Sequence, residues 1–435
     1  MSLKPPVDKV EKLQAALHSK AKAFPDYRFY LLYDKVYRAD VLAVAYRCCR
    51  SNDGAPGVDG QTFADIEEYG RERWLGELAE ELRKKAYQPQ AVLRKWIPKA
   101  DGKQRPLGIP TICDRVVQMA AVLVLEPIFE ADLQPEQYAY RAGRSQHDAL
   151  GAVQELIRAG YTEVVDADLS GYFDTIPHAE LMKSVARRVS DRHMLHLVKM
   201  WLEAPVEETD EQGRKQRTTR NKDEGRGTPQ GGVASPLLAN LYMRRFVLGW
   251  KTLGHEQQLD ARLVNYADDF VICTRPGRAE AAMEAMRRIM GKLKLTVNEK
   301  KTRICRLPEG TFNFLGYTFG RLYSFRKGRF YLGMAPKDER IQGACRKISE
   351  RTDRRTTWQA VPEMVKDLNC HLRGWSNYFS VGTHVPAYKI VLKHARNRLR
   401  RWLCKKHKVR GDGQKRFPNK YLHAELGLIQ LRGVS

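Results

Sequence analysis

The stretch that decides the fold is Arg262-Leu263-Val264-Asn265-Tyr266-Ala267-Asp268-Asp269-Phe270-Val271-Ile272-Cys273. Two apolar runs with β-branched residues flank two consecutive aspartates, which predicts a β-hairpin with Ala267-Asp268-Asp269 at its turn. Adjacent carboxylates repel each other, and a turn without another role more often carries Asn-Gly or Asp-Gly. We therefore expect a divalent cation such as Mg²⁺ beside them, because that ion binds one or two carboxylates together with substrate phosphates. An isolated acidic turn is usually a solvated loop, so other segments must support this interpretation.

A second acidic stretch reads Glu163-Val164-Val165-Asp166-Ala167-Asp168-Leu169-Ser170-Gly171-Tyr172-Phe173-Asp174. It predicts a core strand that ends in acidic residues, with Asp166 and Asp168 on one face because side chains alternate along a strand. If this strand lies beside the hairpin in a sheet, three carboxylates meet and require cations. That arrangement is typical of two-metal phosphoryl transfer.

Two further segments suit an anionic ligand. Residues 95–110 predict two strands joined at Asp101-Gly102, and their cations, including Lys99 and Arg105, could fold over phosphate oxygens. Residues 227–242 form a glycine-rich turn that leads into an apolar helix, and glycine lets the backbone approach a ligand closely. Each pattern has an ordinary alternative: an exposed charged hairpin for the first, and a plain turn before a buried helix for the second.

The charge of the chain favours a polyanionic partner. Its net charge is +25 and its pI is near 9.7. Residues 326–435 contain 26 basic and 8 acidic side chains, so this quarter holds +18 of the +25. Aromatic residues are interleaved with these cations, which suits binding to RNA through its backbone and shape. The alternative is a helical bundle with a solvated basic face.

Some classes of protein are excluded by composition. The eight cysteines are scattered and form no Cys-x-x-Cys pair, which argues against a disulfide framework or a zinc site. The chain has no apolar signal region at its start and no apolar run of transmembrane length. We therefore expect no membrane partner and a cytoplasmic location, in the bacterial cytosol or nucleoid.

The order of the short motifs carries a family resemblance. Asp168 precedes an aromatic residue by five positions, and downstream of it lie the remaining four motifs: Pro229-Gln230-Gly231, Tyr266-Ala267-Asp268-Asp269, the segment 298–302 and Phe314-Leu315-Gly316. In this order the five resemble the fingers and palm of a reverse transcriptase.

Three more segments narrow the resemblance to the bacterial group II intron-encoded reverse transcriptase/maturase family. They are Gly54-Ala55-Pro56-Gly57-Val58-Asp59-Gly60, Arg105-Pro106-Leu107-Gly108-Ile109-Pro110 and Leu368-Asn369-Cys370-His371-Leu372-Arg373-Gly374-Trp375-Ser376-Asn377-Tyr378-Phe379. The third looks like the maturase (X, or thumb) motif.

This resemblance implies an α+β right-hand polymerase fold. Fingers and palm, an antiparallel sheet with helices, would span residues 51–320 after a helical N-terminal extension at 1–50. An all-helical thumb or maturase X domain would follow at 321–390. A small basic region at 391–435 would resemble a DNA-binding module. No His-Asn-His or paired Cys-x-x-Cys segment follows the thumb, so we expect no endonuclease domain.

The resemblance also assigns roles to residues. Asp168, Asp268 and Asp269 match the catalytic aspartates, which with the Leu169 carbonyl would hold two Mg²⁺ ions; Asp166 is the alternative to Asp168. The nucleotide-binding positions are Lys99, Arg105, Phe173, Gln230 and Lys301, with Phe173 as the steric gate against a 2′-OH. We further expect RNA or DNA contacts from Arg141, Arg144, Arg373, Trp375, Arg396, Arg400, Arg401, Lys405 and Lys406. The loop at 138–145 departs from the family's aromatic-Arg-Pro pattern, which weakens the roles given to Arg141 and Arg144.

The function that the resemblance implies is RNA-directed DNA polymerisation. Its partners would be the group II intron RNA, an RNA template with a DNA primer, target DNA and dNTPs. Such a protein would assist splicing of its intron and copy it into DNA during retrohoming. Two alternatives remain: an RNA-binding splicing factor with secondary polymerase activity, or a domesticated relative that serves DNA repair or phage defence.

Overall fold

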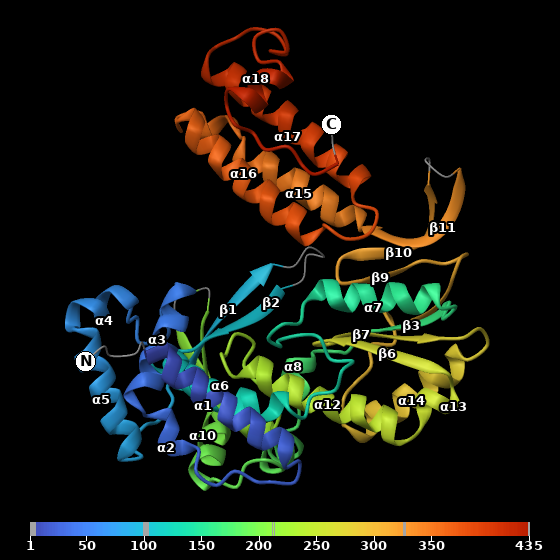
Figure 1. The fold of residues 1–435 in the computed structure, drawn as a ribbon. Coiled ribbons are helices and arrows are strands. Elements are labelled where there is room, and N and C mark those ends of the chain that lie inside the picture. The colour runs from blue at the N-terminus through green and yellow to red at the C-terminus, as the bar shows by residue number, and fades with distance from the viewer. Residues whose placement is uncertain (1–5, 99–103, 211, 213, 325–327, 434–435) are drawn as a thin grey trace. The chain divides into compact units, whose positions relative to one another are not determined.

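The computed structural model describes residues 6–98, 104–210, 212, 214–324 and 328–433 (Figure 1). The chain forms two compact units. The first draws on residues 1–149, 167–272 and 280–303, and the second on residues 150–166, 273–279 and 304–435. Helices and strands are mixed, as the predicted α+β class requires. No helix among the described residues is both long enough and apolar enough to cross a membrane.

The first unit contains most of the helices. They are α1 (Pro6–Ala23), α2 (Tyr33–Val36), α3 (Ala39–Ser51), α4 (Phe63–Tyr69), α5 (Arg71–Arg83), α6 (Ile112–Glu130), α8 (Tyr172–Thr175), α9 (His178–Ala186), α10 (Arg192–Glu203), α11 (Arg220–Glu224), α12 (Ser235–Thr252), α13 (His255–Gln258) and α14 (Ala279–Lys292). Helix α6 contacts α1, α3 and α12. It is apolar on nearly every face and therefore lies in the core.

Two strand systems position the site in the first unit. Strands β1 (Val92–Pro98) and β2 (Gln104–Ile109) pair antiparallel, as predicted, in a sheet of order β2-β1-β4-β5. Its other members, β4 (Val206–Thr209) and β5 (Lys215–Thr218), form the ribbon that precedes the glycine-rich turn. Strands β6 (Ala261–Tyr266) and β7 (Asp269–Thr274) confirm the acidic hairpin.

The central sheet has the order β6-β7-β3-β8, with β3 (Glu163–Ala167) next to β7 and β8 (Arg303–Arg306) at the edge. Strand β3, which leads to Asp168, is thus next to β7 of the acidic hairpin. This is the arrangement that would allow the three carboxylates to come together. Residues 312–319, which contain the Phe314-Leu315-Gly316 motif, do not extend this sheet. They belong to a separate sheet of order β11-β10-β9, because β10 continues past residue 319 and pairs with a third strand along its whole length.

The second unit contains that separate sheet and the basic helices. Its strands are β9 (Phe312–Phe314), β10 (Tyr317–Ser324) and β11 (Arg329–Pro336). Its helices are most of α7 (Gln146–Arg158), α15 (Asp338–Arg351), α16 (Val361–Tyr378), α17 (Val385–Lys406) and α18 (Asn419–Ala424), with the short 3₁₀ helix η1 (Arg354–Thr356). Helices α15, α16 and α17 pack against one another (Figure 1).

Candidate active site

The hairpin turn holds its two carboxylates at the surface. Asp268 and Asp269 are exposed, whereas the flanking Ala267 and Phe270 are buried. Ala267 has a φ of 58°, a left-handed conformation that costs a non-glycine residue about 1–2 kcal/mol. The buried Asn265 side chain stabilises this turn, since its Nδ2 donates to the Ala267 carbonyl at 2.8 Å. The strained turn therefore depends on support from the strand before it.

Asp168 is held by the segment that follows helix α14. The Asn298 backbone N–H donates to the Asp168 carbonyl at 2.8 Å, and Asn298 Nδ2 donates to Asp168 Oδ2 at 2.9 Å. Lys301 Nζ lies 3.3 Å from the same carboxylate oxygen. Leu169 forms an isolated antiparallel bridge with Val297. The sequence assigned Lys301 to the site but missed Asn298, although the quoted motif begins with it.

One cavity of about 470 Å³ collects the predicted catalytic and nucleotide-binding residues. Eight of the nine line it: Arg105, Asp168, Leu169, Phe173, Gln230, Asp268, Asp269 and Lys301. The ninth, Lys99, lies outside the described residues. Asp166, the alternative to Asp168, is not among the residues that line this cavity. The geometry thus favours Asp168 over Asp166.

Three side chains form a chain of hydrogen bonds across one wall of the cavity. Arg105 Nε donates to Gln230 Oε1 at 3.0 Å, and Gln230 Nε2 donates to Asp174 Oδ2 at 2.9 Å. Part of the Asp174 surface is accessible, yet desolvation by the surrounding protein raises the pKa of its carboxyl above the usual value. Because both polar ends of the Gln230 amide are engaged, its orientation is fixed. The sequence analysis gave Asp174 no role, although it directly follows Phe173.

The backbone reinforces the same wall. The Gly108 N–H of β2 donates to the Gln230 carbonyl at 2.6 Å, which joins the ribbon that carries Arg105 to the glycine-rich turn. Gly231 has a φ of 115°, and a Cβ added there would collide with the Gly108 carbonyl oxygen. Only glycine permits this approach and this conformation. The glycine-rich turn is therefore shaped by its contact with β2.

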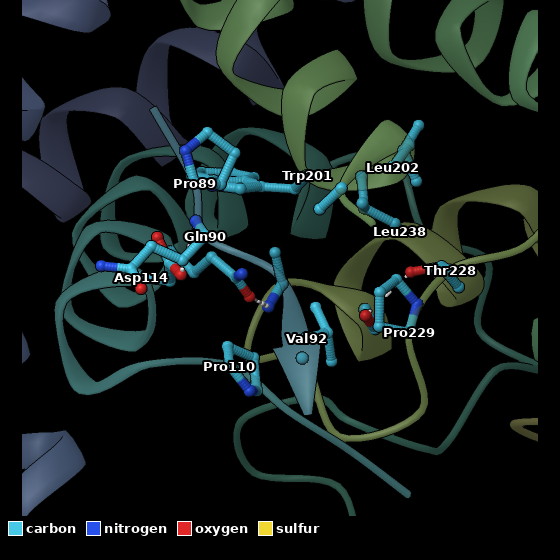
Figure 2. A pocket seen from close by; sticks show the side chains of 15 residues that line it. Pro89, Gln90, Val92, Pro110, Asp114, Trp201, Leu202, Thr228, Pro229 and Leu238 are labelled. Atoms are coloured by element: carbon cyan, nitrogen blue, oxygen red, sulfur yellow. Dashed lines mark hydrogen bonds between the residues drawn. The ribbon is translucent and has the colours of Figure 1, made fainter. Parts of the chain in front are cut away.

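A small cavity of about 10 Å³ lies under this turn, with room for about one water molecule. Figure 2 shows Thr228 and Pro229 on one side of it, Gln90 and Asp114 on the other, and Val92 between them. The Asp114 carboxylate accepts from Tyr87 Oη at 2.6 Å, from Thr111 Oγ1 at 2.8 Å and from the Gln90 N–H at 3.2 Å. Burial raises the pKa of Asp114. This polar network forms part of the support beneath the wall of the larger cavity.

Tyr140 is a second residue near the carboxylates that the sequence analysis missed. Its φ is 54° and its side chain is 49% exposed. Desolvation raises the pKa of its hydroxyl, and the nearby charge of Asp268 adds to this increase. The backbone places it there, because the Tyr138 N–H donates to the Asn265 carbonyl at 3.0 Å. Tyr140 belongs to the loop at residues 138–145, in which only Arg141 and Arg144 were predicted to contact nucleic acid.

The arginines of that loop hold the loop itself together. The Arg141 side chain is 6% exposed and forms a forked ion pair with Glu130, with Nη2 to Oε1 at 2.6 Å. Its Nη1 also donates to the carbonyls of Gln134 and Gln137, each at 2.7 Å. Arg144 donates to the Pro135 carbonyl at 2.8 Å. Arg141 therefore offers little surface to a nucleic acid.

The predicted contacts in the second unit divide into engaged and exposed side chains. Arg400 is buried and donates to the Phe417 carbonyl at 2.9 Å, and Arg396 donates to His423 Nε2 at 2.8 Å. Trp375 packs its ring against Phe379 and Tyr388. Lys406 is bonded to two backbone carbonyls. The exposed members of the set are Arg373, Arg401 and Lys405.

The donor chemistry of the large cavity fits a hard cation. Carboxylate oxygens from Asp168, Asp268 and Asp269 line it, and magnesium prefers such ligands. Within the described residues, however, no three His, Cys, Asp or Glu side chains are grouped closely enough to hold a metal by themselves. The residues present fit magnesium only in its usual form, in which substrate phosphates and water complete the coordination shell.

Comparisons with known proteins agree with this geometry. A reverse transcriptase (RNA-dependent DNA polymerase) family model matches residues 97–319, and a group II intron maturase-specific domain model matches residues 341–422. The chain belongs to the group II intron reverse transcriptase/maturase family. The predicted polymerase fold is thereby confirmed. The maturase match runs across residue 390, where the sequence analysis expected a separate basic region to begin.

Curated relatives of this reverse transcriptase cover different shares of it. Protein YkfC of Escherichia coli (strain K12) is 34% identical over 344 residues, which cover 71% of this chain and 87% of YkfC. Group II intron-encoded protein LtrA of Lactococcus lactis subsp. cremoris is 34% identical over 227 residues, 51% of this chain and 36% of LtrA. Among solved structures, one chain of a partial Cas6-RT-Cas1–Cas2 complex is similar to this protein. The match covers 62% of this protein and 43% of that chain, with 23% identity and a TM-score of 0.35, and no conclusion rests on it.

Proposed function

We propose that this reverse transcriptase copies group II intron RNA into DNA, and that it also binds the intron RNA and assists its splicing. The observation that carries the proposal is the single cavity into which distant motifs bring three carboxylates, Arg105, Phe173 and Gln230. Its substrates are a DNA primer on an RNA template and dNTPs, and target DNA receives the intron copy. We place the protein in the bacterial cytosol or nucleoid, where these partners occur.

The acidic residues hold the cations of the reaction. Asp168, Asp268 and Asp269, together with the Leu169 carbonyl and the nucleotide phosphates, bind two Mg²⁺ ions. The chemistry that these ions supply when bound is charge stabilisation at the attacking and leaving oxygens of an in-line displacement. Lys301 Nζ lies 3.3 Å from an Asp168 carboxylate oxygen, and its charge would offset that of the departing pyrophosphate.

The other cavity residues bind and orient the incoming nucleotide. Arg105 presents a guanidinium to its triphosphate, and Lys99, which lies outside the described residues, would add a second cation. Gln230 is held by its bonds to Arg105 and Asp174, so it meets the nucleotide in one orientation. Phe173 is buried and lines the cavity, and its ring would exclude a sugar with a 2′-OH. Most of the rate then comes from positioning and electrostatics.

Primer extension on an RNA template tests the proposal. Replacing Asp268 by Ala removes one cation ligand, and we expect single-turnover extension to fall roughly 10³-fold or more, which corresponds to several kcal/mol of charge stabilisation. RNA binding should persist. The matched control is Glu284→Gln on α14, which removes an exposed carboxylate that pairs with Arg288 outside the cavity. Normal extension by Asp268→Ala would refute the site.

A splicing assay separates the two activities of the proposal. The Asp268→Ala variant should still support splicing of the intron RNA at low Mg²⁺, because that role requires binding and no polymerisation. If the variant loses splicing support while it still binds the RNA, splicing support also depends on the cavity, and the two activities are not separable in this way.

A further inference from the structure

Trp358 is the most exposed large hydrophobic side chain among the described residues, at 79%. Single exposed hydrophobic residues are common on soluble domains and need no explanation by themselves. Trp358 differs because the loop that presents it, residues 357–360 between η1 and α16, is held by hydrogen bonds on both sides of the indole. A local movement of the backbone therefore cannot bury the exposed indole.

The fastening comes from helix α17. Lys406 Nζ donates to the Thr357 carbonyl at 2.9 Å and to the Gln359 carbonyl at 2.8 Å, which are the residues directly before and after Trp358. Trp402 Nε1 donates to Thr356 Oγ1 at 3.0 Å. Such a clamp reduces the conformational entropy that a ligand would otherwise have to remove on binding.

The surroundings of the loop are basic. Arg354 and Arg355 of η1 directly precede it and are exposed, and Arg401 and Lys405 are exposed on the last turns of α17, which carries the clamping Lys406. The carboxylate of Asp353 caps η1 by accepting from the Arg355 N–H at 2.9 Å. An aromatic plane among exposed cations is complementary to a nucleotide, which has an apolar base and a negative phosphate. A neutral apolar partner would gain nothing from these charges.

We propose that Trp358 is a stacking platform for one unpaired base of a bound RNA, and that Arg354, Arg355 and Lys405 hold the adjacent phosphates. The inference rests on the proposed RNA-binding function and names a site for it in the second unit. The platform is built in advance, because Lys406 and Trp402 fix the loop whether or not RNA is present. It also gives Lys406 a positioning role in place of the direct contact that the sequence analysis expected.

The test compares the affinities of full-length variants for an unstructured single-stranded RNA and for a blunt RNA duplex at several salt concentrations. Trp358→Ala should weaken single-strand binding by roughly 5- to 100-fold, the range for one lost stacked base. The salt dependence should not change, because no phosphate contact is lost. Trp358→Tyr should retain most of the affinity. Ile390→Ala is the matched control, since Ile390 is 53% exposed on α17 and carries no charge.

Fluorescence gives a second, independent measurement. The emission of the wild-type protein minus that of Trp358→Ala isolates the exposed indole, and single-stranded RNA should quench it. Unchanged RNA affinity of Trp358→Ala, or no quenching of this difference emission, would overturn the inference. Self-association that Trp358→Ala abolishes, without any effect on RNA binding, would also overturn it and identify a second copy of the chain as the occupant.

The outcome is separable from that of the proposed function. A chain that extends primers but binds RNA equally well with and without the Trp358 indole refutes the platform alone. A chain that never extends primers refutes the polymerase function, while a loss of single-strand affinity in Trp358→Ala would still support the platform.

Discussion

The carboxylate cavity of the first unit and the basic helices of the second unit use charge in opposite ways. In the cavity, Asp268 and Asp269 stay exposed on a strained turn, and the side chains around them are engaged mainly with one another. In the helices, cations such as Arg400 and Lys406 are bonded to backbone carbonyls of nearby loops. Charged residues in the motifs thus came together in one cavity, whereas several charged residues predicted from basic composition are bonded within the fold.

The difference has a physical origin. Several carboxylates at one place are unfavourable unless a ligand compensates them, so a sequence that keeps them signals a site. An arginine carries five N–H donors and readily satisfies the carbonyls of irregular segments. In the loop-rich region 407–418, for example, the Phe417 carbonyl accepts a hydrogen bond from Arg400 of α17. Net charge indicates that a region binds a polyanion, but not which cations do so.

The largest expected effect is on stability, and it compares the buried Arg400 with its exposed neighbour Arg401. Arg400→Ala removes donors from the Phe417 carbonyl and from Asn419 Oδ1, which is bonded at 2.6 Å. We expect the free energy of opening of the α17–α18 segment to fall by roughly 2–4 kcal/mol, as for other buried hydrogen-bonded charges. Native-state hydrogen exchange measures this loss.

Arg401→Ala is the matched control, because the side chain at 401 is exposed. The free energy of unfolding of this variant should stay within about 0.5 kcal/mol of wild type. The plot of log K for single-stranded RNA against log salt concentration should become less steep by about 0.7, the value for one lost phosphate contact. If both variants destabilise the segment equally, the distinction between bonded and exposed cations in the basic helices is wrong.

A smaller effect is expected at the wall of the cavity. Asp174→Ala removes the acceptor that holds Gln230 Nε2. A hydrogen bond to a charged group contributes about 1.5–3 kcal/mol, so kcat/KM for dNTP incorporation should fall roughly tenfold or more, mainly through KM. Asp174→Asn keeps one acceptor oxygen and should recover most of the activity. Loss of activity through kcat alone, without recovery in Asp174→Asn, would contradict a role of Asp174 in orienting Gln230 for nucleotide binding.

The smallest effect is a pH dependence beneath that wall. The pKa of Asp114 is raised in the folded protein by burial, so the folded state retains the proton at pH values where the unfolded chain has lost it. The contribution of Asp114 to stability is therefore fully present below its unfolded pKa of about 3.9 and is lost as the pH rises through the folded pKa.

Urea unfolding across this acidic window measures the effect. Asp114→Asn cannot ionise, so its unfolding free energy should lack this decline, a difference in slope of up to about 1.4 kcal/mol per pH unit. Parallel pH profiles of the two proteins would show that folding leaves the pKa of the Asp114 carboxyl unchanged, which would contradict this prediction.

Sequence patterns alone predicted the hairpin, the order of the motifs and many of the residues that line the cavity, but not Asn298. Alternation of apolar residues and paired aspartates are local signals, and eight of nine predicted residues line one cavity. Only the tertiary structure decided that Asp174 fixes Gln230, that Tyr140 lies near Asp268, and that Lys406 clamps the loop of Trp358. These contacts join segments far apart along the chain, or residues whose types fit many surroundings. Local patterns specify elements, whereas packing decides which side chain each element meets.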